Sequence, residues 1–365
     1  MRITFVLPCY PRRPIGGFRV AYEYANRLVA RGHEVAVVHP RRFASATPLL
    51  ATSFYQRLRR QGARLRDVLF PPHVHWQPID KQVRMLYVAD LDASQVPDGD
   101  AVFATSWPTV EHVAGYPACK GKKFYLVQDF DPWLGPRERL QATWRLPFQK
   151  VTVSRWLYKQ VVDAEGGPEN VVNIPNGIDH ERFHLTADMG QRPKQLVMFF
   201  RRESYKAPED GALALEIAKR GHPGMSAAVL GQAYRKPPRV PPWASYLRRV
   251  SDDQLIAIYN SSSIFVGSSL AEGFALPPAE AMACGCAVVS TDCGGIREFA
   301  EPEVTALLSP PGDPEALARN ILRLLDDDAL RQRLAAAGHE RIQSFTWERS
   351  TDQLEVFMRK QVGRG

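Results

Sequence analysis

The chain has 365 residues, more than one hydrophobic core usually organises, so its length predicts two domains. Apolar residues make up 45% and charged residues 24% of it, proportions that exclude a disordered or fibrous chain. The net charge of +8 lies entirely in residues 1–180, which hold 24 Lys and Arg against 16 Asp and Glu. An anionic partner for this half is one interpretation, and compositional bias is the other.

Five cysteines are scattered along the chain, and Cys284-Gly-Cys286 lacks the spacing of a zinc ligand pair. We therefore expect reduced thiols and a cytoplasmic protein. The opening residues, MRITFVLPCYP, are interrupted by Pro8 and indicate a first β-strand rather than a signal peptide. No apolar run approaches the ~18 residues of a membrane span, so no such span is predicted.

The first half begins with a strand–helix–strand pattern. A buried strand is predicted at Ile3 to Leu7, a helix at Phe18 to Ala30 and a second strand at 33–39. Gly16 and Gly17 stand before the helix, without the G-x-G-x-x-G of a dinucleotide site. A glycine pair here permits close approach of the backbone to a phosphate, although a plain tight turn explains it equally well.

The segment 53–70, SFYQRLRRQGARLRDVLF, is predicted to form a basic amphipathic helix. Its apolar residues fall on one face and arginines flank that face, a pattern compatible with peripheral contact with an anionic membrane at the inner face. An ordinary surface helix packed on its own domain is the favoured interpretation, because such helices are far commoner.

Buried-type strands follow at 101–104, 123–127 and 151–153, and a helix is predicted after the last of them. Loops after parallel strands commonly bind ligands. We therefore expect polar residues of these loops to line a cleft, namely Thr105, Ser106, Gln128, Asp129 and Ser154. Asp129-Phe-Asp131 also has a D-x-D spacing suited to a divalent metal, but such short matches recur in this chain, and no metal is expected.

The second half repeats the alternation of strands and helices. Asn176-Gly177 is predicted to form a turn, and the polar segment 180–194 is predicted to link the domains. Strands are predicted at 195–200, 226–230, 245–247, 264–266, 286–290 and 306–308. Helices are predicted at 207–219, 252–260, 277–285, 314–325, 329–342 and 346–360.

The stretch from Ile264 to Phe299 holds the most specific pattern. Glu280 lies on an otherwise apolar predicted helix, where a buried carboxylate needs hydrogen-bond partners. It either meets a backbone N–H or a structural arginine, or it accepts hydrogen bonds from ligand hydroxyls. Between Glu272 and Glu280, main-chain N–H groups lead into a helix N-terminus, which suits an anion; they belong to Phe274, Ala275 and Leu276.

A cluster of cations, Arg201, Arg202 and Lys206, follows the first strand of the second half. Such cations suit a diphosphate, although a solvated loop is the plainer explanation. Together the patterns predict an α/β protein with two doubly wound, Rossmann-like domains that face a central cleft. The expected ligand combines a diphosphate with sugar hydroxyls, which describes a nucleotide-sugar.

The chain resembles glycosyltransferase family 4, whose members are retaining enzymes with the GT-B fold. The resemblance rests on Glu272-Gly-Phe-Ala-Leu-Pro-Pro-Ala-Glu280, the family's E-x7-E pattern. Neighbouring motifs agree: Asn176-Gly-Ile-Asp179, the pair Arg201 and Lys206, Cys293-Gly-Gly-Ile-Arg-Glu298, and Phe345-Thr-Trp-Glu348. The resemblance covers nearly the whole chain and is more specific in the second half. The first half, with LVQDFDPW, is most similar to rhamnosyltransferase-like members.

The resemblance implies an acceptor-binding domain at 1–185, with the helix 346–365 packing back on it, and a donor-binding domain at 195–345. It implies catalytic roles for Glu272, which holds donor-sugar hydroxyls, and for Arg201 and Lys206, which neutralise the diphosphate. It also implies that the donor is bound by Gly16, Gly17, Gly273, Phe274, Ala275, Leu276 and Glu280, with Glu280 on the ribose.

The implied reaction moves a hexose or 6-deoxyhexose from a nucleoside-diphosphate sugar to a hydroxyl of a glycan, lipid-linked or natural-product acceptor. Front-face attack, with the leaving diphosphate taking the acceptor's proton, requires no protein nucleophile. Cationic side chains and a helix dipole would stabilise the leaving group, so no metal, no cofactor and no nucleic-acid partner are expected. Two departures are Phe200, where the family has a glycine, and Gln128-Asp129, where many members have a histidine. A 6-deoxy sugar such as rhamnose would not need that histidine.

Other classes stay open. A nucleotide-sugar 2-epimerase has the same architecture but needs no acceptor, and the basic first half argues against it. A non-catalytic nucleotide-sugar-binding subunit is disfavoured by the intact Glu272, Glu280, Arg201 and Lys206. A metal-dependent GT-A enzyme that uses Asp129-Phe-Asp131 is a weaker rival.

Overall fold

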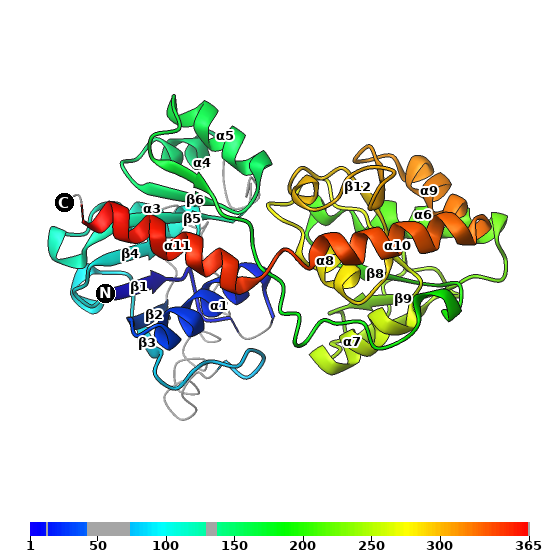
Figure 1. Cartoon of the computed structure of the whole chain (residues 1–365), viewed down its shortest axis with the longest axis horizontal. Helices are drawn as coiled ribbons and strands as arrows, with labels where there is room; N and C mark the ends of the chain where they lie inside the picture. Colours follow the sequence, from blue (N-terminus) through cyan, green and yellow to red (C-terminus); the bar gives the residue numbers. More distant parts are fainter. Residues whose placement is uncertain (12–13, 42–73, 129–136, 364–365) are drawn as a thin grey trace, which may run out of the picture. The chain divides into compact units, whose positions relative to one another are not determined.

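The computed structural model describes residues 1–11, 14–41, 74–128 and 137–363, and the chain divides into two compact units (Figure 1). Unit 1 comprises Met1–Thr152, Val161–Ile174 and Thr351–Gly365, and unit 2 comprises Val153–Gln160 and Pro175–Ser350. The predicted basic helix at 53–70 and the Asp129-Phe-Asp131 segment lie outside the described residues.

Unit 1 contains a parallel sheet with the strand order β3-β2-β1-β4-β5-β6-β7. The strands are β1 (Arg2–Val6), β2 (Glu34–Pro40), β3 (Arg84–Val88), β4 (Ala101–Ala104), β5 (Lys122–Val127), β6 (Gln149–Thr152) and β7 (Val171–Asn173). β1, β2 and β4 are buried along nearly their whole length, as expected of strands covered on both faces. The chain runs from β1 to β3 on one side and from β4 to β7 on the other, so the switch point lies between β1 and β4.

The helices of this unit are α1 (Gly16–Ala30), α3 (Trp107–Ala114) and α4 (Arg137–Trp144), whereas α5 (Arg155–Glu165) and α11 (Trp347–Val362) each belong partly to both units. The C-terminal part of α11 packs within unit 1, where the Phe357 and Phe124 ring centroids lie 6.0 Å apart. Glu355 of α11 accepts hydrogen bonds from Arg31 and His33 at 3.1 and 3.0 Å. These contacts join the last helix to the end of α1.

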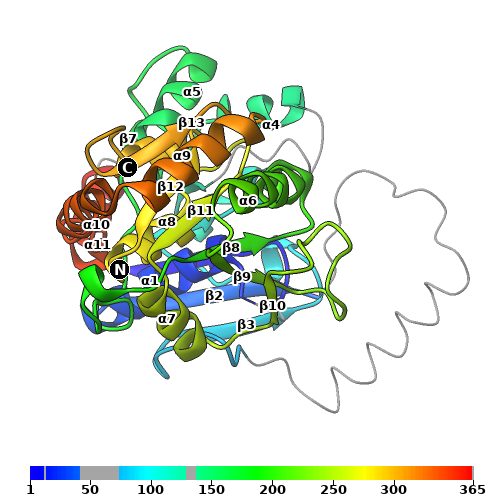
Figure 2. The same cartoon turned by 90° about the vertical axis from the view of Figure 1, so that its right-hand side faces the viewer.

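Unit 2 contains a parallel sheet with the order β10-β9-β8-β11-β12-β13, and Figure 2 shows β10, β9, β8 and β11 side by side. The strands are β8 (Gln195–Phe200), β9 (Ser226–Gly231), β10 (Ser245–Arg248), β11 (Ile264–Gly267), β12 (Ala287–Thr291) and β13 (Ala306–Ser309). The helices are α6 (Pro208–Gly221), α7 (Asp252–Ser261), α8 (Leu276–Ala283), α9 (Pro314–Asp326) and α10 (Asp328–Ile342). The switch point of this sheet lies between β8 and β11.

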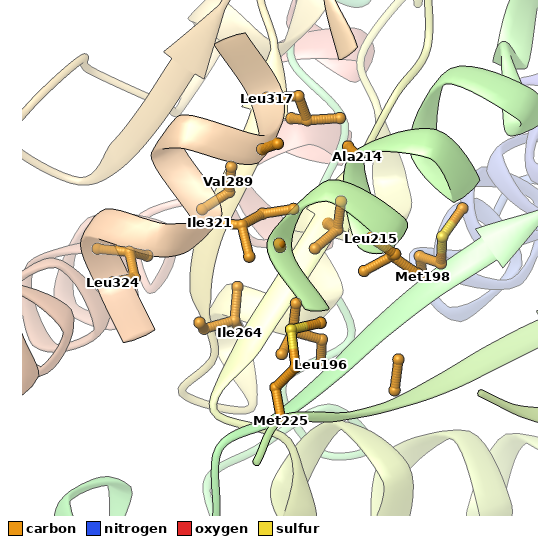
Figure 3. Packing of buried hydrophobic residues seen from close by; sticks show 14 of the residues in the cluster. Leu196, Met198, Ala214, Leu215, Met225, Ile264, Val289, Leu317, Ile321 and Leu324 are labelled. Atoms are coloured by element: carbon orange, nitrogen blue, oxygen red, sulfur yellow. The ribbon is translucent and has the colours of Figure 1, made fainter. Parts of the chain in front are cut away.

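The core of unit 2 lies between its sheet and the helices α6 and α9 (Figure 3). Strand residues such as Leu196, Ile264 and Val289 contribute one side of it, and Leu215 and Ile321 of the two helices contribute the other. All five side chains are fully buried. This packing fixes the β8 and β11 ends, from which the candidate site is built.

The predicted α/β class with two doubly wound sheets is confirmed. Among the described strands and α-helices, β3, β7, α3 and α4 were not predicted. β3 is only partly buried and lacks a continuous apolar run, and α3 is a helix of eight residues that begins at Trp107-Pro108, so its first turn resembles a loop.

The predicted Asn176-Gly177 turn is wrong, because Ile178 forms a parallel bridge with Thr346. A Cβ on Gly177 would lie 2.2 Å from the Trp347 nitrogen. This glycine therefore permits the close approach of a second segment, not a turn.

Candidate functional site

The switch point of unit 2 brings together residues from two loops that are distant in sequence. Lys206 ends the 3-10 helix Ser204–Lys206, which follows β8, and Glu272 lies in the loop that follows β11. Because β8 and β11 are paired neighbours, their carboxyl ends place these loops at one edge of the sheet. Ligands of open α/β sheets bind at this position.

Lys206 and Glu272 form a close ion pair. The Lys206 ammonium donates to Glu272 Oε1 at 2.7 Å and to Oε2 at 2.6 Å. The Ser269 hydroxyl donates to Oε1 at 2.6 Å. The two charged side chains are 20% and 14% exposed, so water reaches the pair only in part. Lys206 also lies 4.5 Å from the centre of the Tyr205 ring.

The loop that carries Glu272 is held by the Gly294-Gly295 segment. The Glu272 N–H donates to the Cys293 carbonyl at 2.8 Å, and the Gly295 N–H donates to the Glu272 carbonyl at 3.0 Å. A Cβ on Gly295 would lie 2.1 Å from the Gly273 oxygen. Residue 295 must therefore be glycine for the loop to keep this path.

The loop ends at the N-terminus of α8. Phe274 is buried, and its ring centroid lies 5.3 Å from that of Phe299 and 6.1 Å from that of Phe345. Ala275 has a left-handed conformation with φ of 69°, which is costly for a residue with a Cβ. In the described part of the chain, the N–H groups of Phe274 and Ala275 have no acceptor. These N–H groups can therefore bind an anion.

Glu280 lies on α8 and is only 7% exposed. It is near Tyr259 of α7, whose pKa is raised well above its ordinary value, first by burial and then by the negative charge of Glu280. Arg201 acts on the same phenol in the opposite direction. The guanidinium of Arg201 stacks 5.1 Å above the Phe199 ring, and Arg202 is exposed. The structure thus brings Glu280 and Arg201 to the same region of unit 2.

A second group of predicted residues gathers at the switch point of unit 1. Gly16 and Gly17 begin α1, and the Gln128 amide after β5 donates to the Gly17 carbonyl at 3.0 Å. The Thr105 hydroxyl after β4 donates to the Val6 carbonyl at 2.9 Å. The Gln128 amide lies 3.4 Å from the Thr105 carbonyl. Gly17, Thr105 and Gln128 are therefore neighbours in unit 1.

Two predicted serines have structural positions. Ser106 immediately precedes α3, and its N–H donates to the Thr109 hydroxyl at 3.2 Å. Ser154 is fully buried, and its hydroxyl accepts from the Leu157 N–H at 3.3 Å at the start of α5. The role of Ser154 as a cleft residue stays a prediction. Asp129 lies outside the described residues.

Sequence reasoning missed several residues of this region. Ser269, Tyr205 and Tyr259 contact or adjoin the predicted charges, and Gly295 shapes their loop. Within the described ranges, no three His, Cys, Asp or Glu side chains gather as metal ligands would. None of the described helices combines the length and the apolar character needed to cross a membrane.

The two doubly wound sheets and the site at the unit 2 switch point define a class of two-unit α/β proteins, the GT-B fold. Solved structures share it. Anabaena Alr3699/HepE in complex with UDP-glucose has a TM-score of 0.75 at 17% identity, over 99% of this chain and 100% of that one. Sucrose-phosphate synthase from Thermosynechococcus elongatus has a TM-score of 0.72 at 17% identity, over 100% of both chains.

Residues 244–341 match the model of the family glycosyl transferases group 1. O-antigen chain mannosyltransferase B of Escherichia coli is 34% identical over 149 residues, 40% of this chain and 38% of that protein. Glycogen synthase of Mycobacterium tuberculosis (strain H37Rv) is 25% identical, with 100% of this chain and 96% of that protein aligned. The predicted resemblance to GT-B glycosyltransferases is confirmed.

Proposed function

We propose that the chain is a retaining glycosyltransferase that uses a nucleoside-diphosphate sugar without a metal ion. The observation that carries this proposal is the pairing of Lys206 with Glu272 beside the open N–H groups of Phe274 and Ala275. A cation and helix-terminal donors suit phosphate oxygens, and a carboxylate suits sugar hydroxyls. Because the diphosphate and the sugar of a nucleotide-sugar are directly bonded, the groups that bind them must lie close together.

In this proposal, unit 2 holds the donor. Arg201, Lys206 and the α8 N-terminus bind the diphosphate and stabilise its growing charge as the glycosidic bond breaks. Glu280 accepts hydrogen bonds from the ribose, and Glu272 accepts them from the transferred sugar. The acceptor hydroxyl attacks from the face that the diphosphate leaves, and the leaving diphosphate takes its proton. Because attack and departure occur on the same face, the sugar keeps its anomeric configuration. Unit 1 binds the acceptor, a glycan, a lipid-linked sugar or a small molecule.

The relatives support a sugar transferase but differ in what their names state, a mannosyltransferase in one case and a glycogen synthase in another. The donor sugar is therefore proposed only as a hexose or 6-deoxyhexose. Gln128 binds the α1 backbone in this chain, and a 6-deoxy sugar such as rhamnose would need no contact from that position.

A panel of UDP-, GDP-, ADP- and dTDP-sugars tests the proposal. Calorimetry is expected to find one donor that binds, and NMR is expected to find its sugar transferred or slowly hydrolysed with retained anomeric configuration. Activity should persist in EDTA. A donor converted to its 2-epimer without hydrolysis would favour the epimerase, and a panel in which nothing is bound or cleaved would refute the transferase.

A further inference from the structure

The charged groups of the candidate donor site are already bound to each other. Both oxygens of Glu272 accept from the Lys206 ammonium, and one of them also accepts from Ser269. A phosphate oxygen that approached Lys206 would therefore meet an ammonium that is already neutralised. It would also meet a carboxylate of its own sign within the same partly buried site, where like charges repel strongly.

The backbone around this pair is fixed independently of the two side chains. The Leu270 N–H donates to the Tyr205 carbonyl at 2.7 Å, and the Ser268 hydroxyl donates to the Lys206 carbonyl at 3.0 Å. The Thr291 hydroxyl donates to the Ser269 carbonyl. The loops after β8 and β11 are thus joined through main-chain groups. The ion pair can open by rotation of side chains while the loops stay in place.

We propose that the donor binds by an exchange of partners at Lys206, which rests on the function proposed above. The diphosphate replaces the Glu272 carboxylate on the ammonium, and the released carboxylate accepts hydrogen bonds from the hydroxyls of the donor sugar. Ser269 is a positioning residue in this exchange, because its hydroxyl keeps Glu272 in the loop after Lys206 has left it.

The exchange makes the site bind the nucleotide-sugar donor in preference to the nucleoside diphosphate product. A nucleotide-sugar supplies both replacements, phosphate for Lys206 and hydroxyls for Glu272. A nucleoside diphosphate supplies only the first and leaves the partly buried carboxylate without its cation, which is unfavourable. After transfer of the sugar, Glu272 therefore returns to Lys206 and weakens the binding of the product.

The test is a calorimetric titration of the full chain with UDP, GDP, ADP and dTDP. Glu272→Gln keeps the shape of the side chain but removes its charge, so the exchange predicts that the best-binding diphosphate binds roughly threefold to tenfold more tightly. The same variant should lose affinity for the nucleotide-sugar relative to the diphosphate. Glu203→Gln is the control, because Glu203 is exposed and lies in the loop of Lys206. It should change the affinity less than about twofold.

Simple repulsion between Glu272 and the phosphates would also tighten binding, and a double-mutant cycle separates the two explanations. The gain from Glu272→Gln should shrink in a Lys206→Met background, because no ammonium remains to be released. An equal gain in both backgrounds, or no gain in the wild-type background, would overturn the exchange. If neither a diphosphate nor a nucleotide-sugar binds to the wild-type chain, the proposed function itself fails, and the exchange fails with it.

Ser269 has its own test. Ser269→Ala should lower the affinity for the nucleotide-sugar more than the affinity for the diphosphate. Ser269→Thr, which keeps the hydroxyl, should restore the wild-type affinity for the nucleotide-sugar. Equal losses for both ligands would contradict the positioning role.

Discussion

Gly295→Ala should damage the donor site through its backbone. A Cβ at this position would lie 2.1 Å from the Gly273 oxygen, 2.3 Å from the Gly273 carbonyl carbon and 2.5 Å from the Glu272 oxygen. All three atoms are main chain, so no side chain can rotate away. Because Cβ contacts essentially never fall below 3.0 Å, the two segments must separate by about 1 Å.

This separation has two measurable consequences. Overpacking that moves a backbone costs about 1–3 kcal/mol of unfolding free energy, which a domain of ordinary stability survives. It also strains the hydrogen bonds of 2.8 and 3.0 Å that hold the Glu272 main chain. A misplacement of about 1 Å in a positioned group lowers the rate about 100-fold. We therefore expect a folded variant with a large loss of sugar transfer.

Urea denaturation and the rate of transfer from the identified donor measure the two effects. Gly224→Ala is the matched control, since its added Cβ would find no atom closer than 4.0 Å. It should leave both quantities unchanged. A Gly295→Ala variant with the wild-type urea midpoint and the wild-type rate would refute the role assigned to this contact.

The remaining predictions concern two structural supports, Arg192 and Glu355, and one residue of the donor site, Glu280. Arg192 is buried and donates to four backbone carbonyls and one amide oxygen. Arg192→Met should therefore lower the free energy of unfolding by about 3 kcal/mol without changing the affinity for the diphosphate. An unchanged urea midpoint would contradict this prediction. Burial raises the pKa of Glu355, but hydrogen bonds from Arg359, Arg31 and His33 outweigh it and lower the pKa to about 2. Because the folded pKa lies below the ordinary 4.5, this stabilisation is present above pH 4.5 and is lost as the pH falls toward 2. Glu355→Gln should flatten that loss in urea titrations, and an equally steep loss would show that Glu355 does not cause it. Glu280→Gln should leave the fold intact and weaken the binding of a ribonucleoside diphosphate about tenfold, as measured by calorimetry. The loss of affinity should be smaller for dTDP, because its deoxyribose has one hydroxyl fewer. An unchanged affinity would show that Glu280 has a structural role only.

Much of the fold could be predicted because local patterns and tertiary structure agree in this chain. Strands such as β4 and β8 are continuous apolar runs, since both faces of each sheet are covered. Glycine and proline mark several helix ends, as at Pro208 of α6 and Pro314 of α9. The short helix α3 and the half-exposed strand β3 could not be found in this way, because neither has a long periodic pattern.

The residue types of the candidate site were predictable, but their contacts were not. Lys206 and Glu272 are 66 positions apart, and their pairing depends on β8 and β11 being neighbours in the sheet. No local signal distinguishes Ser269 from the adjacent serine or explains why residue 295 must be glycine. These features arise from the approach of separate segments, which a single sequence does not encode locally.

The most direct test of donor binding at the β8–β11 edge is acceptor-free cleavage of the nucleotide-sugar panel, followed by release of the nucleoside diphosphate. We predict that the wild-type chain cleaves one donor slowly and that Lys206→Met reduces this cleavage about 100-fold, whereas Lys122→Met, at an exposed position of unit 1, leaves it unchanged. A Lys206→Met variant that cleaves the same donor at the wild-type rate, or a wild-type chain that cleaves none, would contradict the assignment of this edge as the donor site.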